Sequence, residues 1–382
     1  MGEDAECEFA RSGADARTEG ERGGARGGRP EIPAGPRGPR RRAVLRTSDG
    51  VRIEAAYDPY EGETGSASGG ENAGAPGAIV VAHGFSGSVD RPALRRAVRV
   101  FTQYGAVITF SFRGHGGSGG HSTVGDLEVL DLAAAVAWAR ALGHARVATI
   151  GFSMGGSVVV RHGALYRPKA HEGRTGARPR TEPPWAGGGD RPGAAPGSGT
   201  DGSGTEGSGT EGSRPDGPGQ QDAPASGLGA ARPVQGGPGE GEGAEYSDVV
   251  VAVSAPARWY YRGTAPMRRL HWVIQRPVGR LVSRYGLRTR IHPRDWDPVP
   301  LSPVAAAPLL APTPLLVVHG DQDRYFPVDH PYSLAAAGDP DCTDLWLVEG
   351  FGHAENAAEP ALLHRIGGWV ADRWPDPAEG PA

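Results

Sequence analysis

The chain has 382 residues, including 62 glycines and 35 prolines, and a formal net charge of −4. This charge gives no general attraction to nucleic acid, and the arginines at 37, 40, 41 and 42 fit a solvated tail better than a nucleic-acid-binding arm. No apolar run reaches the length of a membrane span or of a signal peptide, so we expect a cytoplasmic protein.

Two long segments have a composition that does not support a folded core. Residues 1–42 are mainly Gly, Arg, Glu and Pro, and they contain Cys7, so a structural disulfide with Cys342 is not expected. Residues 169–245 include a near-perfect five-residue repeat over 197–211. Neither segment has enough apolar surface to offset the entropy of ordering it, so we expect a disordered tail and a disordered insert. The remainder, roughly 250 residues, is enough for a single core.

Strand patterns and helix patterns alternate beyond the tail. A hairpin comes first, with strands over 43–46 and 51–57 joined by a Ser-Asp-Gly turn. Further strands are expected at 78–82, 106–110, 146–150, 248–254, 315–319 and 344–348. Helices are expected at 92–104, 126–142, 154–166, 332–337 and 358–374. Such alternation predicts a mostly parallel sheet with helices on both faces.

Glycine-containing loops follow the third and fourth of these strands. The first loop reads His83-Gly84-Phe85, and we interpret its histidine as a brace that holds the loop by hydrogen bonds. The second loop contains Arg113 and His115, which we interpret as structural support. A glycine-bounded loop can bring a backbone amide within hydrogen-bond reach of a bound molecule without a steric conflict.

The most informative motif, Gly151-Phe152-Ser153-Met154-Gly155, stands between a strand pattern and a helix pattern. A serine in such a tight turn is strained, and a Cβ two residues before or after it would clash. The strain lifts the Ser153 hydroxyl clear of the sheet, and the amides at the start of the helix point toward developing negative charge. This setting is typical of a nucleophile elbow.

A nucleophilic serine of this kind needs an orienting acid and a base, which follow it along the chain in the order Asp or Glu, then His. Asp323 and His353 satisfy this order, and each follows the end of a predicted strand, where open α/β sheets place their sites. Two neighbouring residues are weaker candidates. We interpret Asp321 as a turn former and His319 as structural.

These motifs resemble those of the α/β-hydrolase family, including its serine aminopeptidase and feruloyl-esterase-like branches. The family acid lies in a Gly-x-x-Asp-x-x-x-Pro segment, which Gly320, Asp323 and Pro327 match. The family histidine lies in a Gly-x-x-His loop, which Gly350 and His353 match. The spacing to the proline selects Asp323 over the aspartate two residues before it.

The resemblance implies an α/β-hydrolase fold, with a mostly parallel central sheet, flanking helices, a small helical cap and long disordered insertions. It implies that Ser153 is the nucleophile, His353 the general base and then acid, and Asp323 the group that orients the imidazole. It also implies an oxyanion hole made by the backbone amides of Phe85 and Met154.

The resemblance covers about residues 43–170 and 246–374, and it implies the organisation of the whole chain. The insert lies between a helix and the next strand, and such a connection runs away from the carboxyl ends of the strands. The expected parts are a tail at 1–42, core segments at 43–168, 246–255 and 313–375, the insert at 169–245 and the cap at 256–312.

The expected cap is rich in aromatic residues and arginine. Its aromatic side chains predict an aromatic-walled pocket, made by Trp259, Tyr260, Tyr261, Trp272, Tyr285 and Trp296. The segment has only two aspartates, whereas its arginines stand at positions 258, 262, 268, 269, 276, 280, 284, 288, 290 and 294. Four of them recur every fourth residue and predict a single helical face, namely Arg276, Arg280, Arg284 and Arg288.

The apolar residues of the cap favour the opposite stripe, which we expect to pack downward onto the body of the protein. They are Leu270, Val273, Ile274, Leu281, Val282 and Tyr285. Pro277 is expected to start a second helix, because proline fits poorly inside one. The arginine face has two interpretations: a solvated surface whose carboxylate partners come from the rest of the protein, or a site for an anionic substrate group or an anionic lipid surface.

The predicted triad implies a serine hydrolase that cleaves a carboxylic ester, or a related acyl bond, of a small-molecule substrate through an acyl-enzyme. Amide or peptide hydrolysis, thioester cleavage and acyl transfer use the same machinery and remain alternatives. Ester hydrolysis is favoured over aminopeptidase activity, because an aminopeptidase needs acidic residues for the substrate ammonium and the cap has few. A ligand-binding protein without turnover is the non-enzyme alternative. We expect no cofactor and no metal, and the oligomeric state is not predicted.

Overall fold

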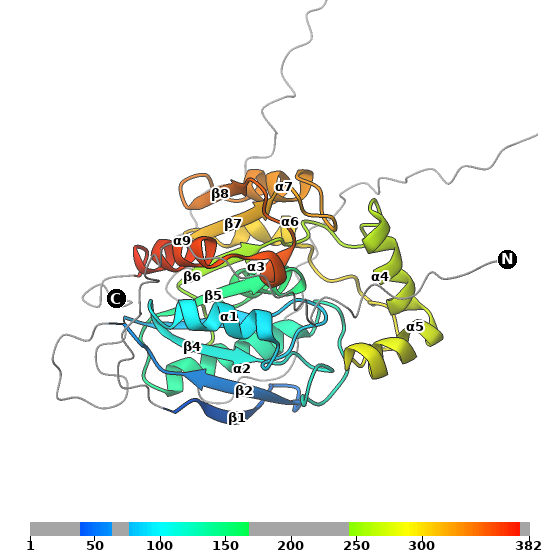
Figure 1. The fold of residues 1–382 in the computed structure, drawn as a ribbon, viewed down its shortest axis with the longest axis horizontal. Helices are drawn as coiled ribbons and strands as arrows, with labels where there is room; N and C mark the ends of the chain where they lie inside the picture. The colour runs from blue at the N-terminus through cyan, green and yellow to red at the C-terminus, as the bar shows by residue number, and fades with distance from the viewer. Residues whose placement is uncertain (1–38, 63–75, 168–243, 375–382) are drawn as a thin grey trace, which may run out of the picture. The chain divides into compact units, whose positions relative to one another are not determined.

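The computed structural model describes residues 39–62, 76–167 and 244–374 of the chain (Figure 1). The predictions of a disordered tail and a disordered insert concern residues that lie almost entirely outside these ranges, and so does the prediction for Cys7. They therefore stay predictions.

The strands of the described residues form one eight-stranded sheet. They are β1 (Arg41–Arg46), β2 (Arg52–Asp58), β3 (Ala78–Ala82), β4 (Ala106–Phe110), β5 (Val147–Phe152), β6 (Val249–Val253), β7 (Leu315–Gly320) and β8 (Thr343–Val348). Their spatial order is β1-β2-β4-β3-β5-β6-β7-β8. The β1–β2 and β2–β4 pairs are antiparallel and the remaining pairs are parallel, which confirms the predicted mostly parallel sheet.

Helices cover both faces of this sheet, as predicted. One face packs against α1 (Pro92–Phe101), α8 (Ala354–Ala357) and α9 (Pro360–Ala371). The other face packs against α2 (Glu128–Ala141), α3 (Met154–Leu165), α6 (Pro303–Ala306), the 3-10 turn η3 (Ala307–Leu309) and α7 (Asp329–Ala337). The interior strands serve both layers because successive side chains point to opposite faces. Val250 of β6 belongs to one apolar cluster, and its neighbours Val249 and Val251 belong to the other.

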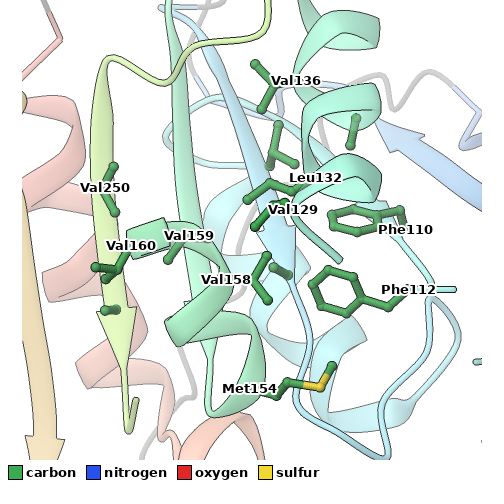
Figure 2. Close-up of a cluster of buried hydrophobic side chains, with 14 of the residues drawn as sticks. Phe110, Phe112, Val129, Leu132, Val136, Met154, Val158, Val159, Val160 and Val250 are labelled. Atoms are coloured by element: carbon green, nitrogen blue, oxygen red, sulfur yellow. The ribbon is translucent and has the colours of Figure 1, made fainter. Parts of the chain in front are cut away.

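Figure 2 shows the cluster in which α2 and α3 meet above the strands. Leu132 and Val136 of α2 belong to the same cluster as Val158 and Val159 of α3, and all four side chains are fully buried. Met154 lies at the foot of the same cluster, at the first residue of α3. The apolar packing therefore fixes the position of the helix that follows the predicted elbow.

Arg40, directly before β1, and Arg41 and Arg42, its first two residues, contact the folded part of the chain, so their interpretation as part of a solvated tail was wrong. Arg40 and Arg42 both bind the Asp90 carboxylate, at 3.1 and 2.6 Å, and Arg40 also lies 3.6 Å from Asp58. The guanidinium of Arg41 lies 4.7 Å from the centre of a tyrosine ring. These arginines hold the edge strand in place.

The segment predicted as a cap lies between β6 and β7 and is largely helical (Figure 1). It contains α4 (Ala265–Gln275), α5 (Pro277–Val282) and the π-helix η2 (Ser283–Leu287), followed by α6 and η3. Pro277 is the first residue of α5, as predicted. Several polar contacts fasten the segment to the rest of the protein. Among them, the Thr264 hydroxyl donates to the Tyr325 carbonyl at 2.8 Å, and the Trp296 indole donates to the Thr123 carbonyl at 2.6 Å.

The predicted single face of four arginines is wrong. Arg276 lies between α4 and α5 in an extended conformation, and Arg288 follows η2 in a left-handed conformation. The proline at the start of α5 cannot continue the preceding helix, and the π-turn changes the angle between successive residues. Only Arg280 and Arg284 lie within the helical run that begins at Pro277.

The predicted burial of the cap's apolar stripe is correct for α4 and wrong for α5. Leu270, Val273 and Ile274 pack against the apolar core. Leu281, Val282 and Tyr285 are instead exposed on the outside of the cap. Periodicity alone did not show which face of the second helix is buried, because the chain changes direction at the proline and the buried face of the first helix does not continue into the second.

Candidate active site

Ser153 stands alone between the last residue of β5 and the first residue of α3. Its backbone has φ 52° and ψ −116°, a conformation that costs a non-glycine residue about 1–3 kcal/mol. Packing on both sides of the turn holds this strain. The turn has the shape that the glycine-flanked motif predicts.

Steric crowding explains why glycines flank the serine. A Cβ on Gly151 would collide with the backbone of Gly155, and a Cβ on Gly155 would collide with the carbonyl of Ala82 on β3. The elbow is therefore compressed between its own helix and the neighbouring strand. Any side chain at either position would push the serine out of place.

The structure brings the predicted acid and histidine to this serine. His353 Nε2 lies 2.9 Å from Ser153 Oγ, and His353 Nδ1 lies 2.7 Å from Asp323 Oδ2. The three residues come from the ends of β5, β7 and β8, so the parallel sheet places them at one edge. The imidazole links hydroxyl and carboxylate in one continuous hydrogen-bonded relay.

The Asp323 side chain is fully buried, and its surroundings keep the carboxyl group ionised. Burial alone would raise the pKa of the Asp323 carboxyl, but the hydrogen bond and charge of His353 and the amides of Tyr325 and Phe326 hold it below its usual value. Those amides donate to Oδ1 at 2.8 and 3.1 Å, so Oδ2 is the oxygen that faces the histidine. The carboxylate is thus fixed in orientation as well as in charge.

The loops that carry the acid and the histidine are packed directly on one another. A Cβ on Gly320 would collide with the carbonyl of Phe351, and Gln322 donates its amide to that carbonyl at 3.1 Å. Asp321 accepts the Gly350 amide at 2.7 Å, which supports its interpretation as a turn residue. His319 is buried with Nε2 2.9 Å from the Phe326 carbonyl, so it supports the acid loop.

Of the two predicted oxyanion donors, Met154 is the first residue of α3, and Phe85 follows Gly84, where an added Cβ would lie 3.5 Å from the Ser153 Cβ. Within residues 39–62, 76–167 and 244–374, neither the Phe85 amide nor the Met154 amide has an acceptor. The phenylalanine loop is closely held: His83 Nε2 accepts the Phe112 amide at 3.0 Å, and Nδ1 lies 2.6 Å from the Gly84 carbonyl. Burial, with a smaller effect of His115, lowers the pKa of His83 to about 3, so this ring is a neutral brace, as predicted.

Two further residues at the site belong to none of the motifs identified in the sequence. Tyr325 stacks on the His353 ring with centroids 4.3 Å apart, and its position two residues after the acid is the only signal in the sequence. Glu355 is buried, accepts the Gly84 amide at 3.3 Å and leaves Oε2 without a partner among the described residues. A Cβ on Gly84 would lie 3.5 Å from both this carboxyl and the Ser153 Cβ, so the glutamate adjoins the site.

The cap forms a small pocket of about 80 Å³ with the loop that follows β4. Tyr260 and Trp296 line it, but the other four aromatic residues predicted for the wall do not. Trp272 and Tyr285 are exposed, which corrects that prediction. None of the three residues of the relay lines this pocket.

The described residues hold neither a metal-ligand cluster nor a membrane-spanning helix. They contain no group of three or more His, Cys, Asp or Glu side chains placed to hold a metal ion. None of their helices is long and apolar enough to cross a membrane.

Comparison with known proteins adds the fold context. Residues 77–170 match the family model described as alpha/beta hydrolase fold, and no curated protein matches the chain. The esterase Pf2001 of Pyrococcus furiosus is 17% identical over 88% of this chain and 93% of its own, with a TM-score of 0.51. The alpha/beta hydrolase GrgF of Penicillium sp. sh18 is 13% identical over 88% and 99%, with a TM-score of 0.50. DcsB, solved with its substrate analogue, is 13% identical over 88% and 98%, with a TM-score of 0.51. At these identities the likeness concerns the fold.

Proposed function

We propose that this protein, which has the α/β-hydrolase fold, is a serine hydrolase that cleaves carboxylic esters through an acyl-enzyme intermediate. The observation that carries the proposal is the unbroken relay from Ser153 Oγ through His353 to Asp323, with hydrogen bonds of 2.9 and 2.7 Å. A nucleophile within reach of a base that is itself oriented by an acid is the arrangement that activates a serine hydroxyl.

The chemistry follows from these positions. Ser153 Oγ attacks the ester carbonyl carbon while His353 Nε2 takes the hydroxyl proton, and the carbonyl oxygen becomes an oxyanion that accepts from the Phe85 and Met154 amides. The intermediate collapses, and the alcohol leaves with the proton from His353. Water, deprotonated by the same nitrogen, then attacks the acyl-enzyme and releases the carboxylic acid and Ser153. The ionised Asp323 stabilises the imidazolium at each stage.

The test is turnover of matched substrates by the purified full chain. We expect hydrolysis of p-nitrophenyl acetate, butyrate or octanoate, with the preferred chain length giving the size of the acyl site. A p-nitroanilide and a thioester with the preferred acyl group compare amide and thioester cleavage. A fluorophosphonate should modify Ser153, as intact-mass and peptide analysis would show. A folded chain that neither turns over any of these substrates nor reacts with the fluorophosphonate contradicts the proposal and favours a binding protein.

The insert is expected to be dispensable for this activity. The chain leaves the described structure after α3 and re-enters before β6, where the Asp248 amide donates to the carbonyl of Val147, the first residue of β5. Ser153 lies past the opposite end of β5. We therefore expect deletion of residues 172–243 to leave kcat/KM within about twofold, because long surface insertions cost little in closure entropy. A deletion variant with a native thermal transition and no turnover would show this to be wrong.

Glu355 is expected to position the oxyanion loop through the Gly84 amide. Glu355→Gln keeps an acceptor of the same size, so kcat should stay within about threefold, whereas Glu355→Ala should lower kcat about ten- to a hundredfold with little change in KM. Equal effects of the two substitutions would contradict this role.

Glu355 also predicts a pH dependence of stability. Burial raises the pKa of its carboxyl above the unfolded value, so its contribution is complete at low pH and is lost as pH rises through the raised pKa. Thermal unfolding from about pH 5 to 8 should therefore show a smaller decline for Glu355→Gln than for the wild type. Identical slopes for the two chains would contradict the shift.

A further inference from the structure

The outer side of the cap carries an apolar stripe that nothing in the described structure covers. Val278, Leu281, Val282 and Tyr285 are 63, 57, 51 and 73% exposed. Val278, Leu281 and Val282 of α5 are spaced i, i+3 and i+4, the spacing by which a helix buries one face, and Tyr285 follows them in η2. Here that face points to solvent.

Small residues, and not the apolar stripe, form the contact of α5 and η2 with the rest of the cap. Gly279 and Ser283 are the buried residues of α5 and η2, and a Cβ on Gly279 would lie 2.6 Å from the Val273 Cα of α4. The Ser283 hydroxyl donates to the Thr289 carbonyl at 3.0 Å. The inward side is therefore fixed by close contact, and turning the stripe toward the core would break these contacts.

The cap's arginines are nearly all without carboxylate partners in the described part of the chain. Arg258 makes the one salt bridge of a cap arginine there, to Asp329. Arg276, Arg284 and Arg288, beside the stripe, are exposed and make none. The interpretation that the rest of the protein supplies acidic partners therefore fails for these three within the described residues, and the cap presents positive charge on a protein of net charge −4.

Some of this positive charge lines a pocket of about 200 Å³, and Leu281 of the stripe lines the same pocket. Its lining includes Arg280, Arg284, Arg290 and His121, and it contains no acidic residue. Two of the arginines are held by backbone carbonyls: Arg280 donates to Gln275 at 3.0 Å, and Arg290 donates to Ser118. Burial, followed by the charges of Arg290, His292 and Arg284, lowers the pKa of His121, which agrees with cations facing this pocket.

We propose that α5 and η2 form a docking surface for an anionic phospholipid bilayer, with a lipid phosphate seated among Arg280, Arg284 and Arg290. A bilayer presents phosphate beside hydrocarbon, so it satisfies the pocket and the stripe together. A second copy of the chain fits less well, because a two-fold contact through this face would bring the same arginines against one another. Docking in this way is independent of turnover.

Vesicle sedimentation tests the proposal, using the Ser153→Ala chain so that lipid hydrolysis cannot alter the vesicles. We expect binding to vesicles of equal parts phosphatidylcholine and phosphatidylserine, and much weaker binding to phosphatidylcholine alone. Arg280→Gln with Arg284→Gln should weaken binding roughly thirtyfold, because each arginine lost near an anionic surface weakens binding roughly fivefold. Leu281→Ser with Tyr285→Ser should weaken it roughly tenfold or more. Thermal unfolding of each variant checks the fold.

A matched control removes the same charge elsewhere. Arg52 of β2 and Arg99 of α1 are exposed, and Arg52→Gln with Arg99→Gln should leave vesicle binding unchanged. An equal loss in this control would overturn a specific surface in favour of general charge attraction. If the chain does not bind vesicles but binds glycerol 3-phosphate through Arg280 and Arg284, then the ligand of the pocket is a soluble anion and the bilayer proposal is wrong. If the chain does not bind vesicles but forms concentration-dependent dimers, and if Leu281→Ser with Tyr285→Ser abolishes these dimers, then the partner of this surface is a second copy of the chain.

Discussion

Replacing Ser153 with alanine is expected to lower kcat for the preferred p-nitrophenyl ester by on the order of 10⁶-fold, about 8 kcal/mol of transition-state stabilisation. The hydroxyl oxygen is the only non-hydrogen atom removed, and it is the atom that His353 Nε2 contacts at 2.9 Å. Alanine also has a Cβ, so it meets the same backbone strain at φ 52° and should keep the elbow. The fold should survive while the chemistry is lost.

The measurement is steady-state hydrolysis together with fluorophosphonate labelling and thermal unfolding. Ser333→Ala is a suitable control, because Ser333 is a half-buried residue of α7 whose hydroxyl, among the described residues, donates only to the Asp329 carbonyl. The control should match the wild type in rate and in labelling. Residual turnover by Ser153→Ala at more than about a thousandth of the wild-type rate would mean that another nucleophile does the work.

Asp323→Asn is expected to lower kcat about 10⁴-fold with little change in stability or KM. The Tyr325 and Phe326 amides donate to Oδ1, so the asparagine oxygen will stay with them and its NH₂ group will face His353 Nδ1. A donor at that place requires Nδ1 to be the acceptor, which puts the imidazole proton on Nε2. Nε2 then donates to Ser153 and cannot take its proton.

The matched control lies two residues earlier. Asp321 accepts a single backbone amide, from Gly350, and its asparagine variant keeps an acceptor, so Asp321→Asn should be close to the wild type in kcat. A rate for Asp323→Asn within about tenfold of the wild type would show that His353 does not depend on this carboxylate for its tautomer. A similar loss in both variants would indicate damage to the loop instead.

The elbow was predictable because its cause is local. Gly151 and Gly155 leave no room for a side chain, and their spacing around Ser153 appears directly in the sequence. The order of the elements was also predictable, since strand and helix periodicities alternate and parallel strands bring their carboxyl ends to one edge. That edge is where the structure brings Asp323 and His353 together with the serine.

Glu355 was not predictable, because its role depends on contact with a loop 271 residues earlier in the chain. From the sequence alone, a glutamate two residues after the histidine has no feature that distinguishes it from other helix residues, because its contact with the Gly84 loop appears only in the folded structure. The same holds for Tyr325, whose stacking on His353 depends on the path of the acid loop.

The sequence by itself therefore determined the sheet, the elbow and the order of the relay, because these depend on local sterics and on strand connectivity. Only the tertiary structure decided which way the cap's second helix faces. Its composition favoured an apolar side turned inward, but the proline break and the close contact at Gly279 turn Leu281 and Tyr285 outward. An amphipathic pattern predicts that a helix has an apolar face and a polar face, but the contacts with neighbouring elements determine which face is buried.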